Sequence, residues 1–177
     1  MGNKLLDIYS DYLICQNKYA TATGLSDLLS GDISHDKITK YLNSVDLGSK
    51  ELWEYNKREI RKHQTDKDGV LILDDSIEEK PYTDENEIVA WHHSHAKGRH
   101  VKGINILSCL VSYNDVVLPF GYEIIHKDVK FSDIETRRLK RKSSTSKNEH
   151  FRNLIQQSVD NKVMFEHVLA DNWFGSK

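Results

Sequence analysis

The feature that most constrains this sequence is a single change in its hydrophobic pattern near residue 65. Through residues 1–63, apolar side chains recur at helical spacing. After the change, Val70–Leu73 forms a continuous apolar run that is followed at once by Asp74 and Asp75. Such a run is typical of a strand buried on both faces. We therefore predict an α-helical N-terminal domain over residues 1–63 and an α/β domain over residues 64–177.

The helical part contains a pattern that suits DNA recognition. A short helix around Leu25–Leu29 and a helix beginning at Ser34 flank a glycine-containing turn, which is the outline of a helix-turn-helix. In that arrangement Lys37 and Lys40 would face the major groove. A plain helical bundle remains the alternative, because residues 1–63 hold nine basic and nine acidic side chains and thus no positive excess.

The second part is predicted to form a mixed sheet. Its expected elements are a hairpin of two strands about Asn114-Asp115, then a helix, then a last strand: Ile104–Tyr113, Val116–Ile125, Asn148–Val159 and Val163–Ala170. Pro119 cannot donate a ladder hydrogen bond, so its strand belongs at a sheet edge. A helix leading into a returning strand predicts that the last strand lies parallel to the first. Asp74 and Asp171 would then follow neighbouring strands in the crevice where open α/β sheets hold ligands.

Two carboxylates in that position indicate a metal site. Mg²⁺ prefers carboxylate oxygens, keeps several waters and takes one or two protein carboxylates. Two such ions about 3.5–4 Å apart can activate water and stabilise the leaving oxygen of a phosphodiester. Aspartate is also common after strands simply because turns favour it, so the spacing alone does not decide between these interpretations.

Composition sets limits on the function. The chain has 177 residues with 25 Lys and Arg against 27 Asp and Glu, so any contact with DNA must come from local patches. One such patch is residues 137–147, which hold six basic and no acidic side chains and are otherwise typical of a solvated segment. Two cysteines are too few for a disulfide scaffold, which favours the cytoplasm, and no apolar run is long enough to span a membrane.

Several segments in order resemble one family. VLILDDSIEEKPYTDENEIVAWHHSHAKGRHVKGINILSCLVSY, DVVLPFGYEII and VLADNWFGS are similar to the DDE transposases of bacterial insertion sequences, whose catalytic domain is ribonuclease H-like. The resemblance covers about residues 20–177. It implies a transposase that binds transposon ends as a homodimer in its complete form and performs DNA cleavage and strand transfer with Mg²⁺ or Mn²⁺ at a two-metal site.

The resemblance also assigns residues. The first catalytic and metal-binding aspartate falls on Asp74, with Asp75 as the runner-up, and the second falls on Asp171. The family's third carboxylate is a glutamate beyond the second aspartate, and this chain ends at Lys177. We therefore expect a C-terminally truncated fragment with an incomplete ribonuclease H-like domain, inactive by itself. The alternatives are a non-catalytic DNA-binding remnant and an unrelated metal-dependent nuclease.

Basic side chains near the predicted crevice are the expected phosphate contacts. Together with the two lysines of the N-terminal helix they are Lys37, Lys40, Lys80, Lys97, Arg99, Lys102, Arg137, Arg138, Lys140, Arg141 and Lys142. The histidines around Trp91, from His92 to His95 with His100, raise zinc as a weaker alternative. Zinc sites usually draw ligands from separated elements, and no cysteine pair accompanies this cluster.

Overall fold

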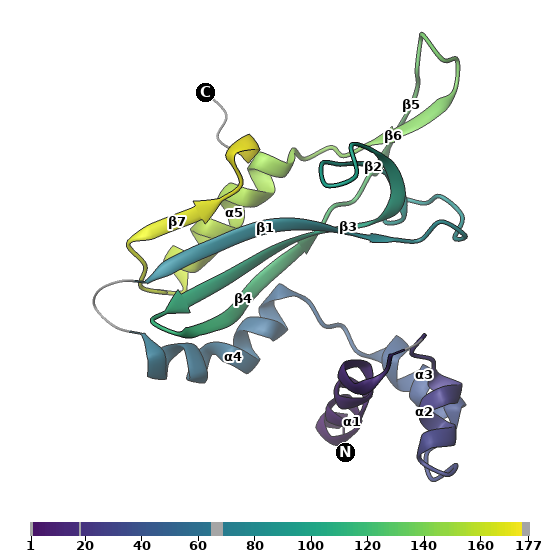
Figure 1. The fold of residues 1–177 in the computed structure, drawn as a ribbon, viewed down its shortest axis with the longest axis vertical. Coiled ribbons are helices and arrows are strands. Elements are labelled where there is room, and N and C mark those ends of the chain that lie inside the picture. Colours follow the sequence, from purple (N-terminus) through teal and green to yellow (C-terminus); the bar gives the residue numbers. More distant parts are fainter. Residues whose placement is uncertain (1, 18, 65–68, 175–177) are drawn as a thin grey trace. The chain divides into compact units, whose positions relative to one another are not determined.

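The computed structural model describes residues 2–17, 19–64 and 69–174, which fall into two compact units, Met1–Leu47 and Gly48–Lys177 (Figure 1). The first unit holds three helices, α1 (Gly2–Cys15), α2 (Ala22–Leu28) and α3 (His35–Ser44). The side chains of the N-cap residues Thr21 and Ser34 accept hydrogen bonds from backbone N–H groups at the starts of α2 and α3. The core of this unit consists of Leu5, Tyr12, Leu25 and Ile38.

Helix α4 (Ser49–His63) belongs to the second unit, where it packs along strand β4 (Val116–Ile124). The Trp53 and Phe120 rings lie 5.3 Å apart, and the Asn56 amide donates to the Pro119 carbonyl at 3.0 Å. The boundary between compact units therefore lies at residue 47, whereas the sequence suggested residue 63. An amphipathic pattern shows that a helix has an apolar stripe, but not which body that stripe covers.

The main sheet of the second unit is mixed, as expected. Its order is β2-β3-β1-β7, and β4 pairs with β3 at the edge predicted from Pro119. The strands are β1 (Val70–Glu79), β2 (Ala90–Ser94), β3 (Arg99–Tyr113) and β7 (His167–Ala170). Strand β3 runs antiparallel to β1, β2 and β4, whereas β7 runs parallel to β1. The predicted parallel pairing of the last strand with the first is thus confirmed.

The hairpin about Asn114 and Asp115 is also confirmed, and Asn114 adopts a positive φ of 51° in its turn. Three features differ from the expectation. Strand β1 continues through both aspartates to Glu79, β7 begins four residues later than expected, and β2 was not foreseen. The basic tract contributes β6 (Leu139–Lys142), which pairs with β5 (Val129–Ser132) in a separate hairpin, so part of it is ordered strand.

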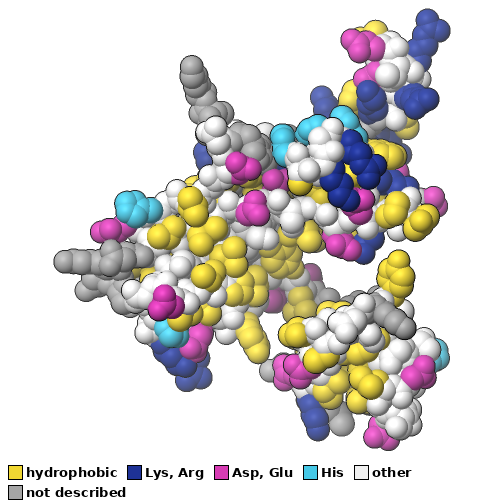
Figure 2. Space-filling view, viewed as in Figure 1, with side chains coloured by type: hydrophobic (Ala, Val, Ile, Leu, Met, Phe, Trp, Pro, Cys, Tyr) yellow, Lys and Arg dark blue, Asp and Glu magenta, His cyan; other side chains and the backbone are white. Residues whose placement is uncertain are grey.

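One face of the main sheet is covered and the other is open. Helices α4 and α5 (Lys147–Asp160) both lie over the covered face, because Ser49 and Leu154 both lie next to Gly121 of β4. Alternate residues of β3 are fully buried there, while those between them are partly exposed. Figure 2 shows hydrophobic side chains gathered on the near face of this unit. In the part of the chain described, no helix is both long and apolar enough to cross a membrane.

Candidate functional site

Asp74 and Asp171 occupy equivalent places on neighbouring parallel strands. The last paired residues of β1 and β7 are Leu73 and Ala170, and each aspartate follows one of them directly. Both aspartates are exposed, and both line a pocket of about 450 Å³. The sequence therefore placed these two carboxylates correctly relative to each other, although β1 runs on past Asp74.

The other walls of this acidic pocket come from the continuation of β1 and from the β2–β3 turn. Glu79 and Lys97 form an ion pair in its wall, with the Lys97 ammonium 2.6 Å from a Glu79 carboxylate oxygen. This hydrogen bond lowers the pKa of Glu79. His93 and His95 also line the pocket, and their rings lie 4.9 Å apart. The site thus combines carboxylates with cationic and imidazole groups.

Asp75 also borders the acidic pocket, but its carboxylate is bound on the covered face of the sheet, opposite to Asp74. Its carboxylate accepts hydrogen bonds from the Asn105 amide at 3.0 Å and from the Lys147 ammonium at 2.6 Å. The Asp75 side chain is only 12% exposed, and Lys147 at the start of α5 is 24% exposed. Asn105 is fully buried and also donates to the Ser76 carbonyl at 3.1 Å. Asp75 is therefore part of an inward-facing polar cluster.

His92 lies near this cluster and is buried in the sheet, with 4% of its surface exposed. Burial, reinforced by the cations Lys127 and Lys147, lowers the pKa of His92 to about 4, while Asp75 opposes the shift. The His92 Nε2 and Asn105 Oδ1 atoms have no hydrogen-bond partner among the described residues. His92 is accordingly a neutral core histidine at physiological pH.

The residue types in the acidic pocket suit a hard divalent cation. Asp74 and Asp171 offer carboxylate oxygens, and Mg²⁺ needs only one or two of these because it keeps several waters. Among the described residues, no three His, Cys, Asp or Glu side chains come close enough to hold a metal ion together. The carboxylates of the two aspartates are compatible in type with a divalent cation that keeps several of its waters.

The predicted phosphate contacts are spread over several surfaces. Lys97 lines the acidic pocket, and Arg138, Lys140 and Arg141 line a second pocket beside it along β2. The remaining side chains of the predicted set border neither of these two pockets: Lys37, Lys40, Lys80, Arg99, Lys102, Arg137 and Lys142. Lys37 and Lys40 are exposed on α3 in the first unit.

Some of these cations already have anionic or aromatic partners. Lys80 pairs with Glu78 at 3.0 Å, and Lys140 pairs with Asp133 at 2.7 Å. The Lys142 ammonium lies 5.7 Å from the centroid of the Phe131 ring. The basic tract is therefore partly neutralised by its own hairpin.

Sequence reasoning did not assign a role to Asn105 or Lys147, and it considered His92 only as part of a weaker zinc alternative. Asn105 stands in the Lys-Gly-Ile-Asn segment that carried the family resemblance, so a signal was present there. Lys147 was counted only as one cation of the basic tract. Its partnership with Asp75 depends on where α5 begins over the sheet, which spacing along the chain does not reveal.

Comparison with known proteins gives one informative result. Neither the curated proteins nor the solved structures contain a match to this chain. The model of one family, described as DDE superfamily endonuclease, matches residues 3–177. A mixed α/β unit with a mixed sheet is compatible with the ribonuclease H-like domain expected for such an enzyme. Because the match spans nearly the whole sequence, the chain belongs to the DDE superfamily endonuclease family.

Proposed function

We propose that this chain is part of a bacterial insertion-sequence transposase that cuts and joins DNA at transposon ends, with Asp74 and Asp171 at its catalytic centre. The family consists of endonucleases, whose substrate is DNA and whose chemistry depends on divalent metal ions. The observation that carries the proposal is that Asp74 and Asp171 follow paired residues of two parallel strands and line one pocket. The ribonuclease H-like domain would then comprise residues 64–177, with α4 packed against it.

Asp74 is a better metal ligand than Asp75 in this structure. The Asp75 carboxylate already accepts from Asn105 and Lys147, and binding a cation would require it to give up the Lys147 ammonium. The Asp74 side chain is exposed on the other side of the strand. A Mg²⁺ or Mn²⁺ ion held by Asp74 and Asp171 would supply Lewis-acid stabilisation of the phosphodiester and a more acidic bound water.

The chain's own residues would bind and position the DNA around this centre. Lys97 on the pocket wall can contact a phosphate by a charge-assisted hydrogen bond. The carboxylates of Asp74 and Asp171 repel the phosphates of the DNA backbone, so neighbouring cations are needed to offset this repulsion. Cleavage at transposon ends further requires that the ends be recognised, and a homodimer is the simplest assembly that holds two ends.

The test of the catalytic centre is Mn²⁺ binding by this chain, followed by electron paramagnetic resonance. We expect Asp74→Asn and Asp171→Asn each to weaken Mn²⁺ binding by at least about tenfold, equivalent to about 1.4 kcal/mol. Asp75→Asn should leave Mn²⁺ binding close to that of the unchanged chain in folded protein. Asp115→Asn, which changes an exposed aspartate in the β3–β4 turn, is the matched control.

Three results would count against this assignment. Loss of Mn²⁺ binding in Asp75→Asn, with Asp74→Asn unaffected, would move the ligand to the other aspartate. Unchanged binding in all three variants would refute the metal site. A chain that binds transposon-end DNA but no Mn²⁺ would instead support a non-catalytic DNA-binding remnant.

The same chain should show little DNA cleavage by itself, even in Mn²⁺. In the described residues no third carboxylate or histidine joins Asp74 and Asp171, and a displacement that uses two ions needs further anionic ligands. Nicking of transposon-end DNA that disappears in Asp171→Asn would contradict this expectation. It would show that another group, or a second copy of the chain, completes the site.

We further propose that the first unit recognises the transposon end through α3. Helices α2 and α3 contact each other, and α3 exposes Lys37 and Lys40. We expect Lys37→Ala or Lys40→Ala to weaken binding to the chain's own transposon end and to lower the log–log salt slope by about 0.9 per lost phosphate contact. Equal affinity for end and scrambled DNA in all variants would favour a plain helical bundle.

A further inference from the structure

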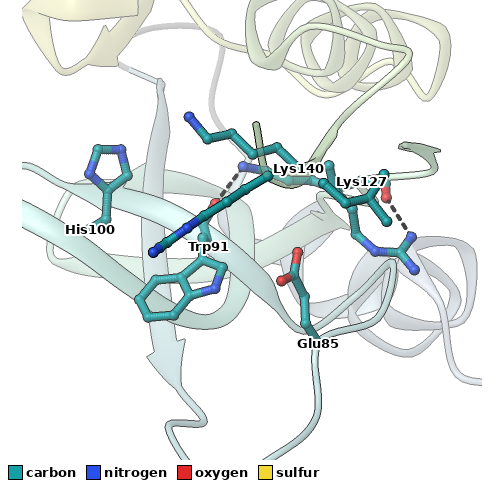
Figure 3. Close-up of a pocket in the computed structure, with 8 residues that line it drawn as sticks. Glu85, Trp91, His100, Lys127 and Lys140 are labelled. Carbon is teal, nitrogen blue, oxygen red and sulfur yellow. Dashed lines mark hydrogen bonds between the residues drawn. The ribbon is translucent and has the colours of Figure 1, made fainter. Parts of the chain in front are cut away.

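A second pocket of about 510 Å³ borders β2 next to the acidic pocket and has no role in the function proposed so far. Its lining includes one large aromatic ring, that of Trp91, which is 50% exposed. Four of the lining residues are basic, Lys127, Arg138, Lys140 and Arg141, against one acidic residue, Glu85. Figure 3 shows Trp91 between His100 and Glu85 in this pocket.

The Trp91 ring stands on a firmly held strand. Its neighbours Ala90 and His92 are buried, and β2 pairs with β3 over all five of its residues. The Lys127 ammonium donates to the Trp91 carbonyl, which Figure 3 marks with a dashed line. Because the strand that carries this half-exposed ring is already ordered, little conformational entropy is lost when a flat ligand stacks on it. The Trp91 ring is therefore a preformed stacking surface.

The pocket also contains cationic side chains that could bind an anionic ligand. Lys140 is occupied by Asp133, and Lys127 by the Trp91 carbonyl. The Arg138 guanidinium has no hydrogen bond or ion pair within the described part of the chain. Arg141 makes one long bond, 3.3 Å, to the Lys127 carbonyl, so most of its donors remain to be satisfied. Planar guanidinium groups beside an aromatic platform suit a phosphate next to a base.

The two pockets are connected through a pair of histidines. His93 lines the acidic pocket and His100 lines the tryptophan pocket, and their rings lie 5.2 Å apart. Trp91 and His93 are two residues apart on the same face of β2, which separates their Cα atoms by about 6–7 Å. Successive nucleotides of one DNA strand are spaced by about 3.4 Å. A strand crossing from one pocket to the other therefore advances by only one to a few nucleotides.

From these observations we propose that the Trp91 pocket binds an unpaired nucleotide of the DNA substrate, a short distance along the strand from the phosphodiester at Asp74 and Asp171. The base stacks on the Trp91 indole, and the flanking phosphates are bound by Arg138 and Arg141. Bases inside a duplex are covered by their stacked neighbours, so this pocket selects a single-stranded or extruded nucleotide. This inference takes the position of the reacting phosphodiester from the proposed function.

The experiment measures binding of fluorescently labelled single-stranded oligonucleotides by anisotropy in the presence of EDTA, so that no metal or cleavage is involved. We expect Trp91→Ala to weaken binding by about 5- to 150-fold, the range found when a stacked base loses its aromatic partner. Trp91→Phe should recover most of the affinity. Arg138→Ala should lower the log–log salt slope by about 0.7. Tyr82→Ala, which removes a 98% exposed ring outside the pocket, is the matched control.

An abasic position moved along the oligonucleotide gives the stricter test. At one position, removing the base should weaken binding by the unchanged chain. The Trp91→Ala variant, which has already lost the stacking contact, should bind the abasic and the intact oligonucleotide equally well. The inference is overturned if Trp91→Ala binds the oligonucleotide as tightly as the unchanged chain does, or if Tyr82→Ala weakens binding equally. It is also overturned if Trp91→Ala causes a further loss of affinity at every abasic position. Circular dichroism and the Trp91→Phe variant separate loss of the ring from loss of the fold.

Failure of this inference is distinguishable from failure of the proposed function. If Trp91 has no effect on single-strand binding while Asp74→Asn and Asp171→Asn abolish Mn²⁺ binding, only the nucleotide pocket is wrong. If those aspartate variants bind Mn²⁺ normally while the abasic test succeeds, the pocket stands and the proposed metal centre falls.

Discussion

Two consecutive aspartates, Asp74 and Asp75, lie in opposite environments because successive side chains of a strand point to opposite faces. On the covered face, Asp75 meets Asn105 and Lys147 under α5 and is nearly buried. On the open face, Asp74 is exposed and shares a pocket with Asp171. One residue step along β1 thus separates a carboxylate with its charge already compensated from one available to a ligand.

The difference indicates how the same side chain can serve stability in one place and chemistry in the other. A nearly buried carboxylate is tolerated only when a cation and hydrogen-bond donors compensate for its lost hydration, as Lys147 and Asn105 do for Asp75. An exposed carboxylate keeps its hydration and can exchange it for a metal ion. We therefore expect substitutions on the two faces to affect different measurements.

The largest effect on folding is expected from Asp75→Ala. It leaves the Lys147 ammonium without its anionic partner in a partly buried position, and we expect a loss of about 2–4 kcal/mol in the free energy of unfolding. Asp74→Ala should change this free energy by no more than about 0.5 kcal/mol, as for an ordinary surface position. Urea denaturation followed by circular dichroism measures both variants under identical conditions.

A double-mutant cycle with Lys147→Met sharpens this result. If the pair is coupled, Asp75→Ala combined with Lys147→Met should cost less than the sum of the two single changes. Additive losses, or a larger loss in Asp74→Ala than in Asp75→Ala, would mean that the two faces do not divide stability and chemistry in this way.

Part of this arrangement could be predicted from the sequence. The apolar run of β1, the turn at Asn114 and the helix preceding β7 are local patterns, and they led to the correct relative position of Asp74 and Asp171. The extension of β1 to Glu79 could not be predicted, since its polar residues become a strand only through pairing with β3. Gly103 permits that pairing, because a Cβ there would lie 2.3 Å from the Glu78 carbonyl oxygen.

The partners of the covered face could not be predicted for a related reason. Asp75, Asn105 and Lys147 lie on three different elements, and their contact depends on the packing of α5 over the sheet. The placement of α4 against β4 likewise depends on the shape of the surface it covers, with Trp53 next to Phe120. Local patterns identify elements, whereas these contacts follow from how the elements pack.

A smaller and pH-dependent effect is expected on the covered face from His92. Its pKa of about 4 lies below the ordinary value of 6.5, so between these values the unfolded chain binds a proton that the folded chain does not. The free energy of unfolding should therefore be independent of His92 titration above pH 6.5. It should fall as the pH decreases toward 4, by up to about 3 kcal/mol from this group.

The check is the free energy of unfolding measured across this pH range. His92→Phe fills the same space without titrating, so it should lose less stability on acidification than the unchanged chain. His126→Gln, which alters an exposed histidine, is the control and should retain the steeper acid dependence. An identical pH profile for His92→Phe and the unchanged chain would show that His92 does not contribute to acid sensitivity.

The smallest effect on stability, and the most specific test of the acidic pocket, concerns the ion pair of Lys97 and Glu79. Both side chains are substantially accessible, at 52% and 32%, so the solvent screens their attraction and either substitution should affect folding far less than Asp75→Ala. Their effects on DNA binding should instead be opposite. Lys97→Ala removes a cation from the wall of the acidic pocket, which should weaken binding and lower the log–log salt slope by about 0.9.

Glu79→Gln removes a competing anion and releases the Lys97 ammonium toward a phosphate, so it should strengthen DNA binding measured by fluorescence anisotropy at constant salt. Parallel losses of affinity in Lys97→Ala and Glu79→Gln would mean that Glu79 is needed to position Lys97, and the pair would then be structural. Opposite changes, with folding unaffected in both variants, are expected only if charge in the acidic pocket is available to a ligand. That availability is the property which distinguishes Asp74 from Asp75 one residue along the same strand.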